Sequence, residues 1–342
     1  MAMSRLHHTE RAGLGRRDLL QLGLAAGLGL LGGCARGQAQ PLLQAAPETL
    51  PPLWRRRLPR PWRFQPLEAK PGSSRAALQI DPSADLLACG DGWLPEFTDE
   101  ALQPVDAAPL QGRLGGQAGR FLEALGPVRA ARVLPVGVSP WVMLFRGSEW
   151  LGGAAEQGWD VLLDPGLRGQ VVLPASPRVV VELADRLDQP ESLGRLRRAA
   201  LTLDDRQALN WLLQGKARAA VLPLQRCAPS LRRDPRLHAV LPSSGAPLHW
   251  TLLLRPATSR EPLPQAWVEA AWQAPLLGQL LARGWRPPVP SQQLQAQAKA
   301  IPASLRSLVL PPQPVWERCW SLPPLEDAAR AQLSRRWRQT AP

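Results

Sequence analysis

Residues 170–187 read QVVLPASPRVVVELADRL, and this stretch decides the class of fold. Its first five residues, Gln170 to Pro174, form an apolar run of the length of a buried strand. The residues from Pro177 to Leu187 have a helical pattern, and a proline at the start suits the first turn of a helix. A buried strand followed directly by a helix is the repeating unit of α/β proteins. The stretch therefore predicts an α/β architecture with a mainly parallel sheet.

The same alternation of strands and helices extends in both directions along the chain. Upstream, the patterns predict strands at 62–67 and 85–90, a helix at 121–131, and two apolar strands at 132–138 and 141–145, broken by Ser139 and Pro140. Downstream, they predict a helix at 203–213, strands at 217–222 and 249–254, and a long helix at 265–283 interrupted at Pro275. No internal repeat is visible, so the chain is a single α/β array of one large domain or two smaller ones.

The N-terminus has the three-part order of an export signal. Arg16 and Arg17 precede a short apolar segment, residues 22–31, and small residues then lead to Cys34. Ten apolar residues are too few to span a bilayer as a helix. Paired arginines are typical of twin-arginine export, and Leu-Gly-Gly-Cys resembles a bacterial lipobox. We therefore expect a signal peptide at 1–33, lipid attachment at Cys34 and a periplasmic, membrane-anchored protein; the alternative is a buried amphipathic helix with a chance cysteine.

Charge limits the partners. The 342-residue chain has a formal net charge of +13, and beyond residue 33 there are 37 basic and 26 acidic residues, a balance of +11. Only three of the basic residues are lysines. Export makes a nucleic-acid partner improbable, and no segment interleaves basic residues with exposed aromatics as single-strand binders do. The basic balance is instead consistent with a protein that works beside an anionic membrane.

The residue types that carry catalysis or metals are scarce. Beyond Cys34 the chain has three cysteines, none at Cys-x-x-Cys spacing, and its two remaining histidines are His238 and His249. These numbers do not support a multi-histidine metal site, and no Ser-His-Asp order, G-x-S-x-G elbow or phosphate-binding glycine motif is present. We predict no catalytic residue, no metal, no cofactor and no enzymatic activity. An exported hydrolase stays a disfavoured alternative.

The order of several sequence blocks resembles a known family. These blocks are residues 85–94 (DLLACGDGWL), 134–145, 158–171 (GWDVLLDPGLRGQV), 208–222, 245–250 and 265–290. In this order they are similar to the periplasmic solute-binding proteins of ABC importers, of the spermidine/putrescine-binding type. The block around Trp159 is fairly specific, and the resemblance covers roughly residues 62–290.

The resemblance implies a fold and a division of the chain. The fold would be the two-lobe periplasmic-binding-protein fold of type 2 topology, with two crossing strands and a cleft between the lobes. The expected parts are a tether at 34–61, lobe one at 62–138 and 254–342, lobe two at 145–247, and crossing strands at 139–144 and 248–253. The protein would bind a small solute, hand it to an ABC permease in the membrane and act as a monomer.

Seven residues are candidates for ligand contact: Asp91, Gly92, Trp93, Trp141, Ser176, Arg178 and Trp250. The first three follow a buried strand, and ligands of open α/β sheets bind at the carboxyl ends of strands. The resemblance implies that Trp141 and Trp250, on the crossing strands, face the cleft. Ser176 and Arg178 open a helix, a position that favours anions.

Each candidate has a structural alternative. Gly90-Asp91-Gly92 is also common turn chemistry, and the tryptophans are equally consistent with core packing. For Arg178 the alternative is a solvated residue of the first helical turn, and we slightly favour this alternative over ligand contact.

Two positions of the chain bear on the expected ligand. Polyamine binders of the family have acidic residues at the start of the second-lobe helix and after the aromatic on the returning strand. Here those places hold Arg178 and Thr251, so Asp91 alone would neutralise an amine. An arginine near the pocket would repel a polycation. We therefore expect a polyamine-like solute by resemblance, bound weakly if it is spermidine. The alternative function is an envelope interaction or sensing protein that no longer binds a transported solute.

Overall fold

The computed structural model describes residues 40–69 and 78–340. The predicted signal peptide, 1–33, and the predicted lipid site, Cys34, lie outside these residues. The elements described below all belong to one unit, Pro41–Pro342. No helix in the described ranges is at once long enough and apolar enough to cross a bilayer.

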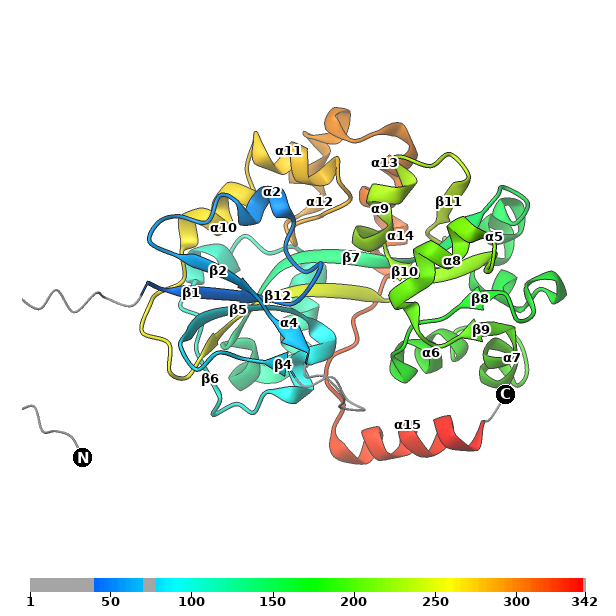
Figure 1. The fold of residues 1–342 in the computed structure, drawn as a ribbon, viewed down its shortest axis with the longest axis horizontal. Coiled ribbons are helices and arrows are strands. Elements are labelled where there is room, and N and C mark those ends of the chain that lie inside the picture. Colours follow the sequence, from blue (N-terminus) through cyan, green and yellow to red (C-terminus); the bar gives the residue numbers. More distant parts are fainter. Residues whose placement is uncertain (1–39, 70–77, 341–342) are drawn as a thin grey trace, which may run out of the picture. The chain divides into compact units, whose positions relative to one another are not determined.

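One large mixed sheet forms the centre of the fold (Figure 1). Its strand order is β2 (Arg63–Pro66), β1 (Leu42–Ala45), β5 (Ala84–Gly90), β12 (Leu248–Pro256), β7 (Val133–Arg146), β10 (Ala219–Pro223), β8 (Val171–Val172) and β9 (Ala200–Thr202). Two strands lie off this path: β6 (Leu102–Gln103) pairs with β12, and β11 (Leu237–Val240) pairs with β7. A separate small ladder joins β3 (Glu68–Ala69) and β4 (Leu78–Gln79). The predicted α/β class is confirmed, but the prediction of a mainly parallel sheet is wrong, because the central pairs β5–β12, β12–β7 and β7–β10 are antiparallel.

Helices cover both halves of the sheet. Around its first half lie α2 (Pro52–Arg55), α4 (Gly116–Ala130), α10 (Gln265–Ala271) and α11 (Leu276–Leu281), and the short α3 (Ala108–Gln111) precedes α4 in the chain. Around its second half lie α5 (Leu151–Gln157), α6 (Pro177–Ala184), α7 (Ser192–Ala199), α8 (Ala208–Gln214) and α9 (Leu224–Leu231). The chain ends with α12 (Ser291–Gln295), α13 (Ala303–Val309), α14 (Gln313–Arg318) and α15 (Asp327–Gln339).

Strand β7 joins the two halves. Its first part, to Pro140, pairs with β12, and the part from Trp141 onward pairs with β10 and β11. The predicted break at Ser139-Pro140 is therefore wrong, because the strand is continuous. Proline lacks the N–H that a ladder needs, but here it lies at the point where β7 exchanges one partner for another, so no central ladder is broken. The Ser139 hydroxyl accepts a hydrogen bond from the Gln225 amide at 3.0 Å and ties this point to α9.

The predicted tether at 34–61 is too long. Strand β1 lies between β2 and β5 and pairs in parallel with both, and its Leu43 is fully buried. Trp54 of α2 is also fully buried and stacks on Trp267 with the ring centroids 4.4 Å apart. A four-residue strand and a four-residue helix are too short to show a hydrophobic period. The high content of proline and arginine around them therefore favoured the prediction of a tether.

The C-terminal part of the chain does not all pack on the predicted lobe one. Helix α13 contacts α9, and α15 lies against α6, an element of the predicted lobe two (Figure 1). Arg336 of α15 forms an ion pair with Asp185, and Arg197 of α7 donates to the Trp337 carbonyl at 2.7 Å. These contacts join the C-terminal helices to elements of the predicted lobe two, and the assignment of 254–342 to lobe one stays a prediction. Contacts between residues about 150 positions apart leave no local pattern in the sequence.

Candidate functional site

The carboxyl end of β5 positions an acidic side chain. The strand ends at Gly90 and continues into a 3₁₀ helix, Asp91–Glu96. The Asp91 side chain is 8% exposed; its Oδ1 accepts a hydrogen bond from the Trp250 amide at 3.0 Å and lies 3.1 Å from His249 Nδ1. Strand β12, the neighbour of β5, therefore fixes the position of this carboxylate.

A glycine makes this arrangement possible. A Cβ atom at Gly90 would lie 2.5 Å from His249 Cε1, which is closer than real atoms come. The imidazole can cover the end of β5 because residue 90 has no side chain. At Gly92 a Cβ would meet nothing within 4 Å, so the close approach depends on Gly90 rather than on the second glycine.

The start of α6 supplies a cation. Arg178 is half-buried, and its Nη1 donates to the Pro323 carbonyl. Burial lowers the pKa of Arg178, while the nearby charges of Glu182 and Asp91 oppose this effect. The buried Nε of Arg178 has no hydrogen-bond partner among the described residues. The first candidate in this segment, Ser176, is exposed and its hydroxyl makes no capping bond to α6.

These side chains line one cavity of about 470 Å³. Six of the seven predicted residues border it: Asp91, Gly92, Trp93, Trp141, Ser176 and Arg178. The Trp141 ring is edge-on to the His249 ring, with the centroids 6.3 Å apart. Two indole rings, an imidazole, two carboxylates and two guanidinium groups therefore line the same space, the second carboxylate being that of Glu96 and the second guanidinium that of Arg330.

Trp250 is the exception. It is fully buried and does not border this cavity. Its ring stacks on Phe121 with the centroids 4.9 Å apart, and its Nε1 donates to the Ser321 hydroxyl at 3.0 Å. Successive residues of a strand point to opposite faces, so the residue of β12 that reaches the cavity is the neighbouring His249. The contribution of Trp250 is its backbone amide, which holds Asp91.

Sequence reasoning missed two parts of the lining. His249 was considered only as a possible base, although its place one residue before Trp250 on an alternating strand could have indicated a cavity position. The second part is the C-terminal segment, which contributes Leu322, Pro324, Leu325, Arg330 and Leu333. No local pattern connects this segment with residues more than 200 positions earlier.

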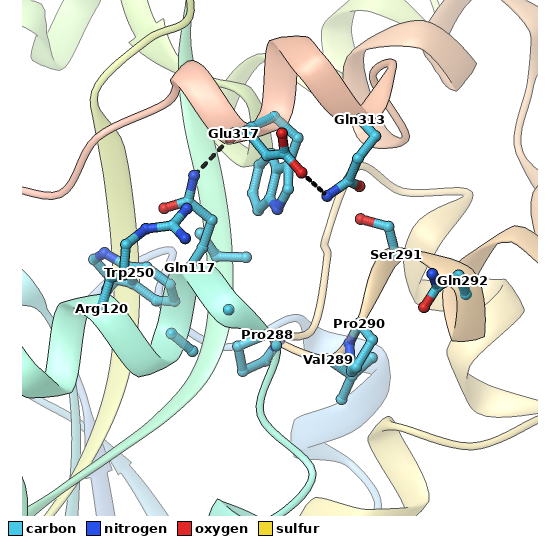
Figure 2. Close-up of a pocket in the computed structure, with 15 residues that line it drawn as sticks. Gln117, Arg120, Trp250, Pro288, Val289, Pro290, Ser291, Gln292, Gln313 and Glu317 are labelled. Atoms are coloured by element: carbon cyan, nitrogen blue, oxygen red, sulfur yellow. Dashed lines mark hydrogen bonds between the residues drawn. The ribbon is translucent and has the colours of Figure 1, made fainter.

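A second cavity, of about 260 Å³, lies between α4, α14 and the segment from Pro288 to Gln292 (Figure 2). Its polar groups largely satisfy one another. The Gln117 amide donates to the Trp316 and Cys319 carbonyls at 2.6 and 3.0 Å, and the Gln313 amide donates to the Glu317 carboxylate at 2.8 Å. Arg120 and Gln292 are left without such bonds, but no described residue of this lining has a buried polar atom without a partner, so this cavity is the weaker candidate.

The described residues offer little for metal or thiol chemistry. Among them, no three His, Cys, Asp or Glu side chains form a group that could hold a metal ion. Cys89, Cys227 and Cys319 are buried and free. Burial raises the pKa of Cys89 and Cys227 to about 12 and that of Cys319 to about 11. All three therefore stay as thiols at neutral pH, the form that is a poor nucleophile.

The fold of this chain is the one found in substrate-binding proteins of ABC transporters. The chain resembles the spermidine/putrescine ABC transporter substrate-binding protein of Streptococcus pneumoniae with a TM-score of 0.61 and 12% identity, over 88% of this chain and 98% of that one. It also resembles the substrate-binding protein of an ABC transporter from Agrobacterium tumefaciens, with a TM-score of 0.59 and 12% identity, over 91% and 96%.

The same fold occurs in an enzyme. Thiaminase I from Bacillus thiaminolyticus matches with a TM-score of 0.58 and 14% identity, over 88% of this chain and 98% of that one. No family model and no curated protein matches the sequence significantly. At these identities the likeness establishes the fold, and the function has to be argued from the cavity.

Proposed function

We propose that this protein is an extracytoplasmic solute-binding protein of an ABC importer, which holds a small solute in the cavity between Asp91, Trp93, Trp141, Arg178 and His249. The observation that carries the proposal is the convergence of these side chains, from the 3₁₀ helix after β5 and from β7, β12 and α6, on one cavity of about 470 Å³. Two aromatic faces beside a few polar groups are typical of small-molecule sites.

The two halves of the sheet supply opposite walls of this cavity. Asp91 and Trp93 follow β5 in the first half, and Ser176 and Arg178 begin α6 in the second. A solute that contacts both walls favours their approach, which is the hinge closure expected of two-lobe binding proteins. The solute-loaded form would then deliver its solute to a membrane permease.

The cavity is a poor fit for a polyamine. Asp91 already accepts the Trp250 amide and lies beside His249, and the other carboxylate, Glu96, is exposed. Arg178 and Arg330 bring two positive charges to the same lining. We therefore expect spermidine to bind much more weakly than it does to the polyamine-binding members of this fold. A solute with a flat apolar part and an acidic or hydrogen-bond-accepting group fits better, because the tryptophan rings and the Arg178 guanidinium can both contact it.

The location follows from the N-terminal sequence. The twin-arginine motif and the lipobox-like segment before Cys34 support export to the periplasm and lipid anchoring at that cysteine. Labelling cells with a radioactive fatty acid tests the anchoring. The label should enter the wild-type protein and be absent from Cys34→Ser.

A thermal-shift screen of small amines, amino acids, carboxylates and sugars tests solute binding. At least one solute should raise the Tm of the wild-type protein by mass action, and this rise should disappear in Trp93→Ala. Arg120→Ala, at an exposed residue of the other cavity, is the matched control and should keep the rise. If no solute raises the Tm, the envelope interaction or sensing alternative is favoured.

The thiaminase I likeness makes an enzyme the second candidate. The Asp91–His249 pair could move a proton, but the described lining of the cavity contains no thiol and the cysteines are held neutral by burial. Incubation with thiamine and an amine or thiol acceptor, followed by chromatography, would detect turnover. We expect none, and product formation abolished by His249→Ala would replace the binding proposal with an enzymatic one.

A further inference from the structure

A third concave surface, separate from the solute cavity and from the Gln117 cavity, is lined by arginines. It has a volume of about 510 Å³ and lies between α2, α9 and the residues that follow α11, elements that Figure 1 shows on the same side of the sheet. Its charged lining consists of six arginines and one glutamate: Arg55, Arg56, Arg226, Arg232, Arg233, Arg283 and Glu48. We call this surface the arginine groove.

Most of the positive charge in the arginine groove is not neutralised. Arg226 pairs with Asp205 and, at 2.9 Å, with Glu48. For the other five arginines, the structure over residues 40–69 and 78–340 places no carboxylate within ion-pair distance. Four of these five are exposed at the rim, and Arg55 lies over the Phe64 ring at 4.3 Å.

This arrangement suits a ligand with phosphate groups. A guanidinium presents a planar fork of donors that matches phosphate oxygens two at a time. Five such groups around one concavity repel each other, and a bound anion reduces this repulsion. No carboxylate of the described lining other than Glu48 opposes the approach of an anion.

We propose that the arginine groove binds the phosphate groups of anionic phospholipid headgroups. The choice of lipid rests on the proposed lipid anchoring. Seven residues separate Cys34 from Leu42, the first residue of β1, and seven extended residues span at most about 25 Å. An anchored chain therefore keeps Leu42, the start of β1, within about 25 Å of the headgroups, and Glu48 and Arg55 of the groove follow within the next 13 residues. At that distance an exposed arginine cluster meets a high local concentration of phosphate.

Vesicle co-sedimentation tests the proposal without the anchor. The protein used is residues 34–342 with Cys34→Ser, which contains the whole unit Pro41–Pro342 and carries no lipid. It should bind vesicles of phosphatidylglycerol and phosphatidylcholine, and not vesicles of phosphatidylcholine alone. Arg232→Glu with Arg233→Glu should lower the partition coefficient at least about tenfold, since each basic residue near an anionic surface contributes about fivefold. Added salt should weaken the binding of the wild-type protein.

The matched control is Arg168→Glu with Arg198→Glu, two exposed arginines outside the groove that give the same change in net charge. This control should bind the vesicles to within about twofold of the wild-type protein. Equal losses in the two double variants would overturn the proposal, because net charge alone would then explain the binding. Binding of free pyrophosphate without vesicle binding would overturn the assignment to lipid.

The groove proposal and the proposed function fail in different ways. The Arg232→Glu, Arg233→Glu variant should keep its solute-dependent rise in Tm, because neither residue borders the solute cavity. Solute binding without vesicle binding would contradict the proposal for the arginine groove and leave the proposed function unaffected. Vesicle binding in a protein that no solute stabilises would support the proposal for the arginine groove and contradict the proposed function.

Discussion

The two cavities beside β12 differ in how their polar groups are used. Around Asp91 and Arg178, aromatic faces and a guanidinium with a buried, unpartnered Nε border the space. In the other cavity, the Gln117 amide donates hydrogen bonds to the Trp316 and Cys319 carbonyls, and the Gln313 amide donates one to the Glu317 carboxylate (Figure 2). Both are concave and both have aromatic faces, but, among the described residues, only the first is bordered by a side chain with a buried polar atom that lacks a partner. Concavity alone therefore does not define a binding site; unused bonding capacity does.

His249 and Trp250 show the same contrast within two residues. His249 faces the first cavity, whereas Trp250 is buried beside Phe121. If this division is correct, Trp250 serves stability and His249 serves the site. Replacing each residue in turn therefore separates the two roles.

The largest effect is expected for Trp250→Ala. The ring is fully buried and stacked, so its loss should destabilise the protein by about 3–5 kcal/mol, which chemical denaturation can measure. Solute affinity, measured under conditions where the variant is still folded, should change little. A stable variant that has lost solute binding would show that Trp250, and not His249, belongs to the site.

A smaller effect is expected for Arg178→Glu. The change restores an acidic residue at the position where polyamine binders have one, and it removes a repulsive charge beside Asp91. Spermidine affinity should rise at least about tenfold by calorimetry, since two opposing charge changes at close range contribute a few kcal/mol. Arg120→Glu, at the Gln117 cavity, is the control and should leave the affinity unchanged. An unchanged affinity in Arg178→Glu would mean that amines do not occupy this cavity.

Gly90→Ala should destabilise the protein by about 1–3 kcal/mol, because the new methyl group would meet the His249 ring at 2.5 Å. Solute binding should weaken with it, since the ring must move. Gly92→Ala, only two residues away, meets nothing and should be nearly neutral in thermal denaturation. Equal effects at the two glycines would contradict the position assigned to His249.

The smallest effect is expected for Asp234→Asn, a surface change that borders neither cavity. Hydrogen bonds from Arg236 lower the pKa of Asp234 from 3.8 to about 2. A carboxyl group with a lowered pKa stabilises the folded protein above its unfolded pKa and loses this contribution as the pH falls through about 2. The variant should be slightly less stable than the wild-type protein at pH 7, and the difference in stability should shrink as the pH falls from 4 toward 2, by denaturation across this range.

Much of the fold could be predicted from the sequence because its elements carry local patterns. The strand and helix of 170–187 correspond to β8 and α6, and the apolar run before Gly90 is β5. The sequence did not predict β1, because four residues among prolines show no period. It did not predict where α15 packs either, since the Arg336–Asp185 ion pair joins residues 151 positions apart.

The candidate site was only partly predictable for a related reason. The Asp91 loop and the start of α6 follow strands, and the ends of neighbouring strands meet at one edge of a sheet. Whether His249 or Trp250 faces the cavity depends on the phase of one strand, and a shift by one residue reverses every side chain. One face of β12 is apolar, with Leu248, Trp250, Leu252 and Leu254, and the other carries His249, Thr251 and Arg255, so the alternation indicates this phase. The resemblance pointed to Trp250 instead, and it does not depend on the alternation of this strand.

A crystal structure of the protein with its most stabilising solute tests the central claim most directly. We predict electron density for the solute between Trp93 and Trp141, in contact with Arg178. Density in the Gln117 cavity instead, or a solute that contacts one half of the sheet alone, would contradict the account.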